Sequence, residues 1–151
     1  MKRLYEMITK ERIIDLRGGT KQDCLQELVD NIALAPEVTD KNDFYISIMK
    51  REKIMSTGIG IGLAVPHVKI DSVKDFVMAI GRKKEGIDFD SLDGRPVHLV
   101  IMIGANTEQR DDYLKVLAKI SILLKNSEFR EKMIHAKSPE EIIDLLKTGE
   151  K

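Results

Sequence analysis

The sequence predicts an α/β fold, in which a mixed central β-sheet is flanked by helices on both faces. The first reason is the order of patterns, because helical periodicities at both ends enclose a middle third of short apolar runs. The second is that the runs over residues 76–82 and 97–103 are apolar on both faces, as in a covered sheet. The third is that the 151 residues contain no repeat, low-complexity tract or linker, which predicts one domain over residues 1–151.

The first third of the chain predicts one strand and two helices. A short strand covers residues 12–16 and is closed by two glycines. Thr20, with Asp23 three residues later, forms a capping-box-like start, and apolar residues then recur at helical spacing. A second helix over residues 40–53 carries its apolar side chains on one side.

The middle third changes character. Residues 57–68 read TGIGIGLAVPHV, a stretch rich in glycine and β-branched residues and without helical period. The two apolar runs that follow have the length of strands. Between them, Asp93-Gly94 is a turn signal.

The last third predicts helices. Asp111 and Asp112 suit a helix N-terminus, where negative charge is stabilised. A short helix is expected over residues 127–136, followed by one that Ser138 caps, with proline at its first position. The helix that begins near Asp111 and Asp112 carries an apolar stripe at i, i+3, i+4 spacing, formed by Tyr113, Val116, Leu117, Ile120 and Leu124.

The composition excludes several classes of protein. The 25 Lys+Arg balance the 25 Asp+Glu, which counts against non-specific binding to nucleic acid. No apolar run reaches the ~18 residues of a membrane span, so no direct membrane insertion is expected. The N-terminus lacks the apolar core of a signal peptide, and the single cysteine, Cys24, excludes an intramolecular disulfide. These features predict a cytoplasmic location.

The residues between Arg51 and Lys69 are the candidate functional segment. They combine an arginine, a Ser-Thr pair, three alternating glycines and Pro66-His67. Glycines let another molecule approach the backbone closely and expose N–H groups to oxyanions. Pro66 restricts the backbone on either side, which suits a precisely oriented histidine.

Two interpretations of this segment have little support. A nucleotide-binding loop would need G-x-G-x-x-G and a helix start, whereas the spacing here is G-x-G-x-G and Pro66 follows. A metal site would need closely spaced ligands, whereas His67, His98, His135 and Cys24 are far apart in sequence. We therefore expect neither a cofactor nor a metal.

Two further interpretations stay open on the residues alone. His67 could be an ordinary hydrogen-bonded turn residue. Alternatively, its neutral imidazole could attack phosphorus with one ring nitrogen while an acceptor holds the other. Arg51 would then supply a cation, and Thr57 and the glycine N–H groups would supply neutral donors.

A resemblance favours the nucleophilic role. The stretch Arg51-Glu52-Lys53 and the stretch Ser56 to His67, STGIGIGLAVPH, are similar to the signature of the fructose/mannitol-type enzyme IIA domains. These belong to the bacterial phosphoenolpyruvate-dependent sugar phosphotransferase system, and nitrogen-regulatory relatives share the pattern. The similarity covers nearly the whole chain. It continues through AIGR at 79–82, GIDFD at 86–90 and DGRPV at 93–97.

The resemblance implies a phosphocarrier function. His67 would accept a phosphoryl group on Nε2 from an HPr-like phosphodonor protein, with Arg51 in support, and pass it to a cysteine of a IIB domain. The alternative that it implies is a nitrogen-type regulatory module, whose phosphorylation state controls binding to a regulatory protein. Many members have a second histidine where this chain has Tyr113. The Tyr113 phenol can donate a hydrogen bond to phosphate but stays neutral at pH 7.

Overall fold

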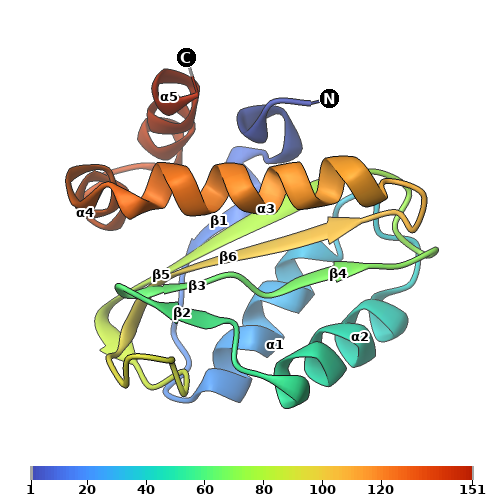
Figure 1. Ribbon diagram of the computed structural model, residues 1–151, viewed down its shortest axis with the longest axis horizontal. Coiled ribbons are helices and arrows are strands. Elements are labelled where there is room, and N and C mark those ends of the chain that lie inside the picture. The colour runs from blue at the N-terminus through green and yellow to red at the C-terminus, as the bar shows by residue number, and fades with distance from the viewer. Residues whose placement is uncertain (1, 151) are drawn as a thin grey trace.

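The computed structural model describes residues 2–150, and a six-stranded mixed sheet lies between two layers of helices (Figure 1). The strands are β1 (Ile13–Asp15), β2 (Gly58–Gly60), β3 (Leu63–Ala64), β4 (His67–Lys69), β5 (Val77–Ile87) and β6 (Val97–Ala105). The helices are α1 (Lys21–Ile32), α2 (Lys41–Ile54), α3 (Arg110–Lys125), α4 (Ser127–His135) and α5 (Pro139–Gly149). Two short 3₁₀ helices, Leu4–Met7 and Lys10–Arg12, precede β1 and were not expected.

The strand order is β1-β5-β6-β3-β2, and β4 pairs with β6 beyond the end of β3. Strands β5 and β6 form an antiparallel pair, while β1 is parallel to β5, and β3 and β4 are parallel to β6. In this register His67 is the partner of Ile103, and Leu63 is the partner of Leu99. The sheet therefore carries His67 to the C-terminal end of β6.

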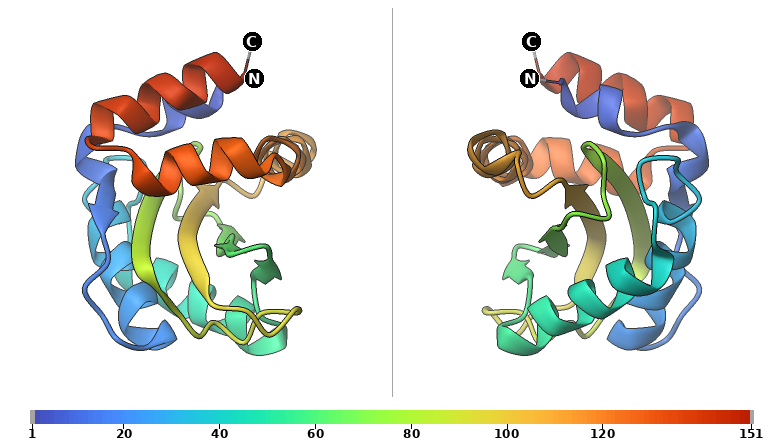
Figure 2. Two further views of the ribbon diagram at one scale, coloured as in Figure 1. Left: turned by 90° about the vertical axis from the view of Figure 1, so that its left-hand side faces the viewer. Right: turned by 90° about the vertical axis from the view of Figure 1, so that its right-hand side faces the viewer.

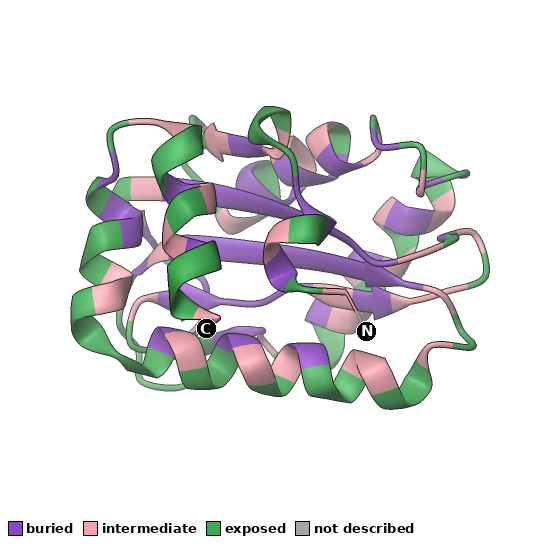
Figure 3. Cartoon of the chain, turned by 90° about the horizontal axis from the view of Figure 1, so that it is seen from above, coloured by how far each residue is buried: buried purple, intermediate pink, exposed green. Residues whose placement is uncertain are grey.

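Both faces of the sheet are buried, as predicted. Along β6 the side chains alternate between two apolar clusters: Leu99 and Ile101 belong to the cluster under α3, α4 and α5, whereas Val100 and Met102 belong to the cluster over α1 and α2. Figure 2 shows the two helical layers on opposite sides of the strands, and Figure 3 shows the buried strands between more exposed helices. The predicted α/β architecture with a covered mixed sheet is confirmed.

The predicted helix starts are also confirmed. The side-chain oxygens of Thr20, Asp40 and Ser138 each accept a hydrogen bond from the backbone N–H three residues later. Each cap satisfies one of the amide groups that a helix N-terminus leaves unpaired. No helix within residues 2–150 has the length and apolarity needed to cross a membrane.

The charged run Arg82-Lys83-Lys84, which follows the apolar run, lies within a strand and not in a solvated turn. Strand β5 continues to Ile87, and Arg82 is buried. Its guanidinium donates to the Ala136 carbonyl at 2.5 Å and lies 3.1 Å from the Asp15 carboxylate. The last carbonyls of a helix lack intrahelical partners, and one arm of the Arg82 guanidinium donates to those at the end of α4.

Candidate functional site

His67 begins β4 and is half-buried, and its ring has a fixed orientation. Nδ1 lies 2.6 Å from the carbonyl oxygen of Val65. A carbonyl only accepts hydrogen bonds, so Nδ1 carries the proton and the lone pair lies on Nε2. Within residues 2–150, Nε2 has no hydrogen-bond partner.

The backbone around His67 is anchored on both sides. The Val65 N–H donates to the Thr57 carbonyl at 3.0 Å, and the Ile103 N–H donates to the Pro66 carbonyl at 3.0 Å. Pro66 fixes its own φ and holds Val65 in an extended conformation. The acceptor for Nδ1 is therefore built into the segment that delivers the histidine.

The surroundings of His67 favour the neutral imidazole. Burial is the main cause that lowers the pKa of His67 below its ordinary value, and the nearby Arg51 charge lowers it further. The Val65 carbonyl and the Glu52 carboxylate act in the opposite direction but do not reverse the shift. Because the resulting pKa lies below 6.5, Nε2 has a free lone pair at pH 7.

Arg51 lies in the last turn of α2, where one arm of its guanidinium donates to the Met55 carbonyl at 2.7 Å. This bond caps the C-terminus of its own helix. The Arg51 charge also lowers the pKa values of His67 and Tyr113, so the guanidinium is electrostatically coupled to both rings. The structure thus brings together three of the four residues that the sequence singles out.

Tyr113 lies in the first turn of α3, and its ring centroid is 5.9 Å from that of His67, with the two planes tilted by 53°. Burial raises the pKa of the Tyr113 phenol well above its ordinary value. The phenol therefore keeps its proton at pH 7 and is a neutral donor beside the imidazole.

The fourth residue, Thr57, is buried and faces Glu52. Its hydroxyl donates to one Glu52 carboxylate oxygen, and its N–H donates to the other at 2.9 Å. The Lys21 ammonium lies 2.6 Å from the same carboxylate. The Thr57 hydroxyl proton is therefore donated to Glu52 in this structure.

Glu52 is a site residue for which the sequence analysis gave no role. A signal was present, because Phe44, Ile48 and Glu52 follow one another at four-residue spacing and are the buried residues of α2. A carboxylate that continues an apolar helix stripe must find partners inside the protein. Here those partners come from α1 and from the residues just before β2.

The glycine stretch serves the fold. The Gly58 N–H donates to the Ser56 hydroxyl, and the Ile61 N–H donates to the Asp93 carboxylate at 3.0 Å. Gly62 lies against the His98 ring, at the opposite end of β6 from His67. The expected N–H donors of this stretch are thus partly used within the protein.

The remaining candidate side chains lie apart from His67. The His98 Nδ1 lies 3.1 Å from the Lys84 carbonyl oxygen, so this ring has a hydrogen-bond partner in the backbone. His135 is exposed beside Glu131, and Cys24 is buried in the α1 layer. Among residues 2–150 there is no group of three or more potential metal-ligating side chains.

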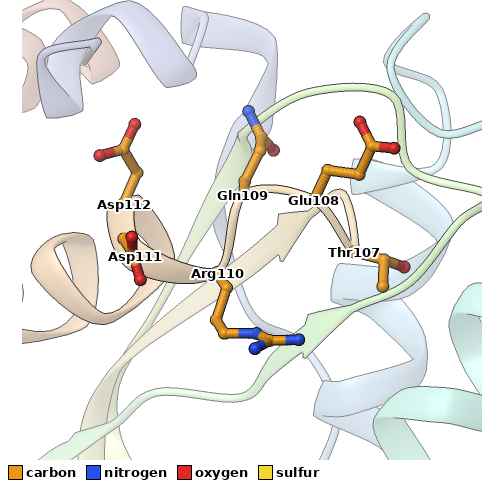
Figure 4. Close-up of a pocket in the computed structure, with 6 residues that line it drawn as sticks. All are labelled: Thr107, Glu108, Gln109, Arg110, Asp111 and Asp112. Carbon is orange, nitrogen blue, oxygen red and sulfur yellow. The ribbon is translucent and has the colours of Figure 1, made fainter.

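The loop between β6 and α3 forms a cavity of about 600 Å³ lined by residues 107–112. Figure 4 shows Arg110 extending away from the side chains of Glu108, Gln109 and Asp112. The carboxylates of Glu108, Asp111 and Asp112 give this cavity a negative lining. An anionic phosphoryl group is disfavoured there, so the half-buried His67 is the better candidate.

Fold and site together define a class of protein. It is an α/β domain that presents a neutral, oriented imidazole at a sheet edge, beside a guanidinium and a neutral phenol. Such an imidazole is a nucleophile, and the neighbouring groups suit an anionic reaction partner.

The comparisons with known proteins identify the family. The family model described as "Phosphoenolpyruvate-dependent sugar phosphotransferase system, EIIA 2" matches residues 6–149. The chain belongs to this family, which confirms the resemblance.

Relatives of two functional kinds are similar to the chain. It is 36% identical over 150 residues to the fructose-specific EIIABC component of Bacillus subtilis. The aligned region covers 99% of this chain but only 24% of that protein's length. It is 34% identical over 141 residues to the fructose-specific EIIA component of Haloferax volcanii, covering 92% of each. The structure of nitrogen regulatory protein IIA-Ntr from Neisseria meningitidis has a TM-score of 0.88 at 29% identity, covering 95% of this chain and 98% of that chain.

Proposed function

We propose that this protein is a phosphocarrier that accepts a phosphoryl group on Nε2 of His67 and passes it to a second protein. The observation that carries the proposal is the 2.6 Å contact between Nδ1 of His67 and the Val65 carbonyl. It leaves Nε2 as the nucleophilic nitrogen and fixes its direction. Membership of the enzyme IIA family supports the same role.

The proposed transfer needs no external acid or base. The Nε2 lone pair of His67 forms a bond to phosphorus, while the bond from phosphorus to the donor atom breaks and its electron pair leaves with the donor. The proton on Nδ1 stays in place, hydrogen-bonded to Val65. In the second step a thiolate of the acceptor attacks phosphorus, and the P–N electron pair returns to Nε2, which restores the neutral imidazole.

The residues around His67 supply different hydrogen-bond donors to the phosphoryl oxygens. Arg51 offers the guanidinium arms that Met55 does not occupy. Tyr113 offers a phenolic proton that it retains across the physiological pH range, because burial raises its pKa. Thr57 supports the site through Glu52, and a direct contact between Thr57 and phosphate stays a prediction.

The donor and acceptor are proposed to be proteins, an HPr-like phosphodonor and a IIB domain. Exposed apolar side chains border the site, which suits contact with another protein. Ile54 and Met55 follow Arg51 and are 81% and 58% exposed, and Leu114 follows Tyr113 and is 62% exposed. The relative from Bacillus subtilis carries the B and C components in its own name.

The proposal is tested by phosphorylation with phosphoenolpyruvate, enzyme I and HPr, followed by intact mass. The wild-type protein should gain one phosphoryl group, and so should His98→Gln, a matched control far along β6. His67→Gln should gain none. Equal labelling of His67→Gln would overturn the assignment.

A regulatory module is the second candidate, favoured by the likeness to nitrogen regulatory protein IIA-Ntr. The two functions differ in where the phosphoryl group goes. Transfer from labelled protein to a IIB cysteine supports the carrier. Phosphorylation-dependent binding to a regulator, with no transfer to any IIB of the same cell, supports the regulatory module.

A further inference from the structure

We propose that Lys69 is a second cationic ligand of the phosphoryl group on His67. The inference rests on the proposed function and adds a residue to it. It starts from the position of Lys69 in β4, two residues after His67. Alternate residues of a strand point to the same face, so His67 and Lys69 share the half-exposed face while Val68 is buried on the other.

Both side chains approach the ring of Tyr113. Its ring centroid is 5.9 Å from the His67 ring and 6.0 Å from the Lys69 ammonium. The lysine therefore reaches back over α3 instead of extending into solvent. Its ammonium and the His67 imidazole lie on a common aromatic neighbour.

The Lys69 charge is not neutralised. Among residues 2–150 no carboxylate lies within ion-pair distance of it, although eight such pairs occur elsewhere. A cation over an aromatic face is held weakly, by about 0.5–1 kcal/mol at an exposed site. Tyr113 thus keeps the ammonium near the site and lets it move onto an anion at little cost.

The charge of the phosphoryl group favours a cation close to its oxygens. The bound phosphoryl group is close to a dianion, and because Nδ1 keeps its proton the phosphorylated ring carries one positive charge, so the site gains about one net negative charge. The half-buried surroundings of His67 disfavour negative charge that has no cation near its oxygens. Arg51 supplies one positive charge, and part of its guanidinium is held by Met55. Tyr113 is neutral and supplies none. Lys69 is a second cation, and its ammonium lies over the same Tyr113 ring that neighbours His67.

The test compares Lys69→Met, which removes the charge, with Lys69→Arg, which keeps it. Lys125→Met, at the far end of α3, is the matched control. Each protein is phosphorylated with phosphoramidate, a small phosphoryl donor, and the ³¹P resonance is followed against pH. Phosphoramidate is used because no partner protein is then present.

Lys69→Met should raise the pH midpoint at which phosphorylated His67 loses its last proton, because a nearby cation stabilises the more negative form. It should also slow phosphoryl acceptance roughly tenfold, below the full effect of an oxyanion donor because the site is half open. Lys69→Arg and Lys125→Met should stay close to wild type in both.

Two results overturn the proposal. One is a Lys69→Met protein whose phosphoryl group titrates like that of the wild type. The other is a Lys69→Met protein that is slowed only with phospho-HPr and not with phosphoramidate, which assigns Lys69 to partner docking. If the wild type itself accepts no phosphoryl group from either donor, the carrier function fails, and this inference fails with it.

Discussion

Nδ1 of His67 donates a hydrogen bond to the Val65 carbonyl oxygen at 2.6 Å, across the single residue Pro66. One tripeptide therefore sets the tautomer, the direction and the nucleophilic atom of the imidazole. Burial then lowers the pKa of His67, so the ring is neutral where a nucleophile is needed. The nucleophilic character of Nε2 therefore follows from the hydrogen bond between Nδ1 and Val65.

The rate of phosphoryl acceptance should fall as the pH is lowered. Protonation of Nε2 removes the attacking lone pair, and the pKa of His67 lies below the ordinary 6.5. The acid limb of the pH–rate profile should therefore have its midpoint below 6.5 and match the imidazole titration followed by NMR. A midpoint above 6.5 would show that the imidazolium is stabilised, contrary to this account.

Pro66→Ala should weaken both stability and transfer. Loss of the ring gives the unfolded chain more freedom, at a cost of about 0.4–1 kcal/mol in the free energy of unfolding. It also loosens the backbone that aims His67, so the transfer rate should fall more than stability alone explains. Urea denaturation and single-turnover labelling measure the two effects. Unchanged transfer would mean that Pro66 does not orient the ring.

Tyr113→Phe should slow phosphoryl acceptance several-fold, because the phosphoryl oxygens lose one neutral hydrogen bond, worth about 0.5–1.5 kcal/mol. The wild-type rate should stay level between pH 7 and pH 9, because burial raises the pKa of the Tyr113 phenol. Quenched phosphorylation reactions at several pH values measure the rate of phosphoryl acceptance. A rate in Tyr113→Phe equal to wild type would remove Tyr113 from the site.

Thr57→Val should destabilise the protein by about 1–3 kcal/mol, because the buried Glu52 carboxylate loses a hydrogen bond. Thr57→Ser keeps the hydroxyl and is the matched control, with a smaller loss from the missing methyl group. Urea midpoints at constant m-value compare the two. Equal midpoints for the two variants would show that the hydroxyl contributes nothing.

Ile61→Asn should stabilise the protein by up to about 1–2 kcal/mol. Ile61 has φ of 55°, a left-handed conformation that costs a β-branched residue about that much. It is 43% exposed, so little apolar burial is lost. Gly62→Ala is the opposite test, because φ is 78° there and the variant should be destabilised. Lower stability of Ile61→Asn in thermal unfolding would contradict the prediction.

Much of the fold could be predicted because the deciding signals are local. Helix caps such as Thr20 and Ser138 satisfy amide groups within one turn, and each lies where the sequence places it. The burial of Arg82 could not be predicted, because its partners, the last carbonyls of α4, lie more than 50 residues away in the chain. Spacing along the sequence cannot indicate such a contact.

The candidate site also contains residues that local sequence indicates and residues whose roles depend on distant contacts. His67 and Arg51 could be chosen from a contiguous motif, and Tyr113 from its place in that motif. Thr57 could also be chosen from the motif, but its hydrogen bond to Glu52 could not be predicted, because that partner is fixed by the packing of α2. A role for Lys69 could not be predicted from the motif, because it depends on α3, which brings the Tyr113 ring beneath the Lys69 ammonium.

The most direct test of the central claim is the identity of the phosphorylated atom. The protein is labelled with ¹⁵N in its histidines and phosphorylated, and the ³¹P–¹⁵N coupling is assigned by NMR. We expect one coupled nitrogen, Nε2 of His67, with Nδ1 still protonated and hydrogen-bonded to the Val65 carbonyl. Coupling to Nδ1 of His67, or to a nitrogen of His98 or His135, would contradict it.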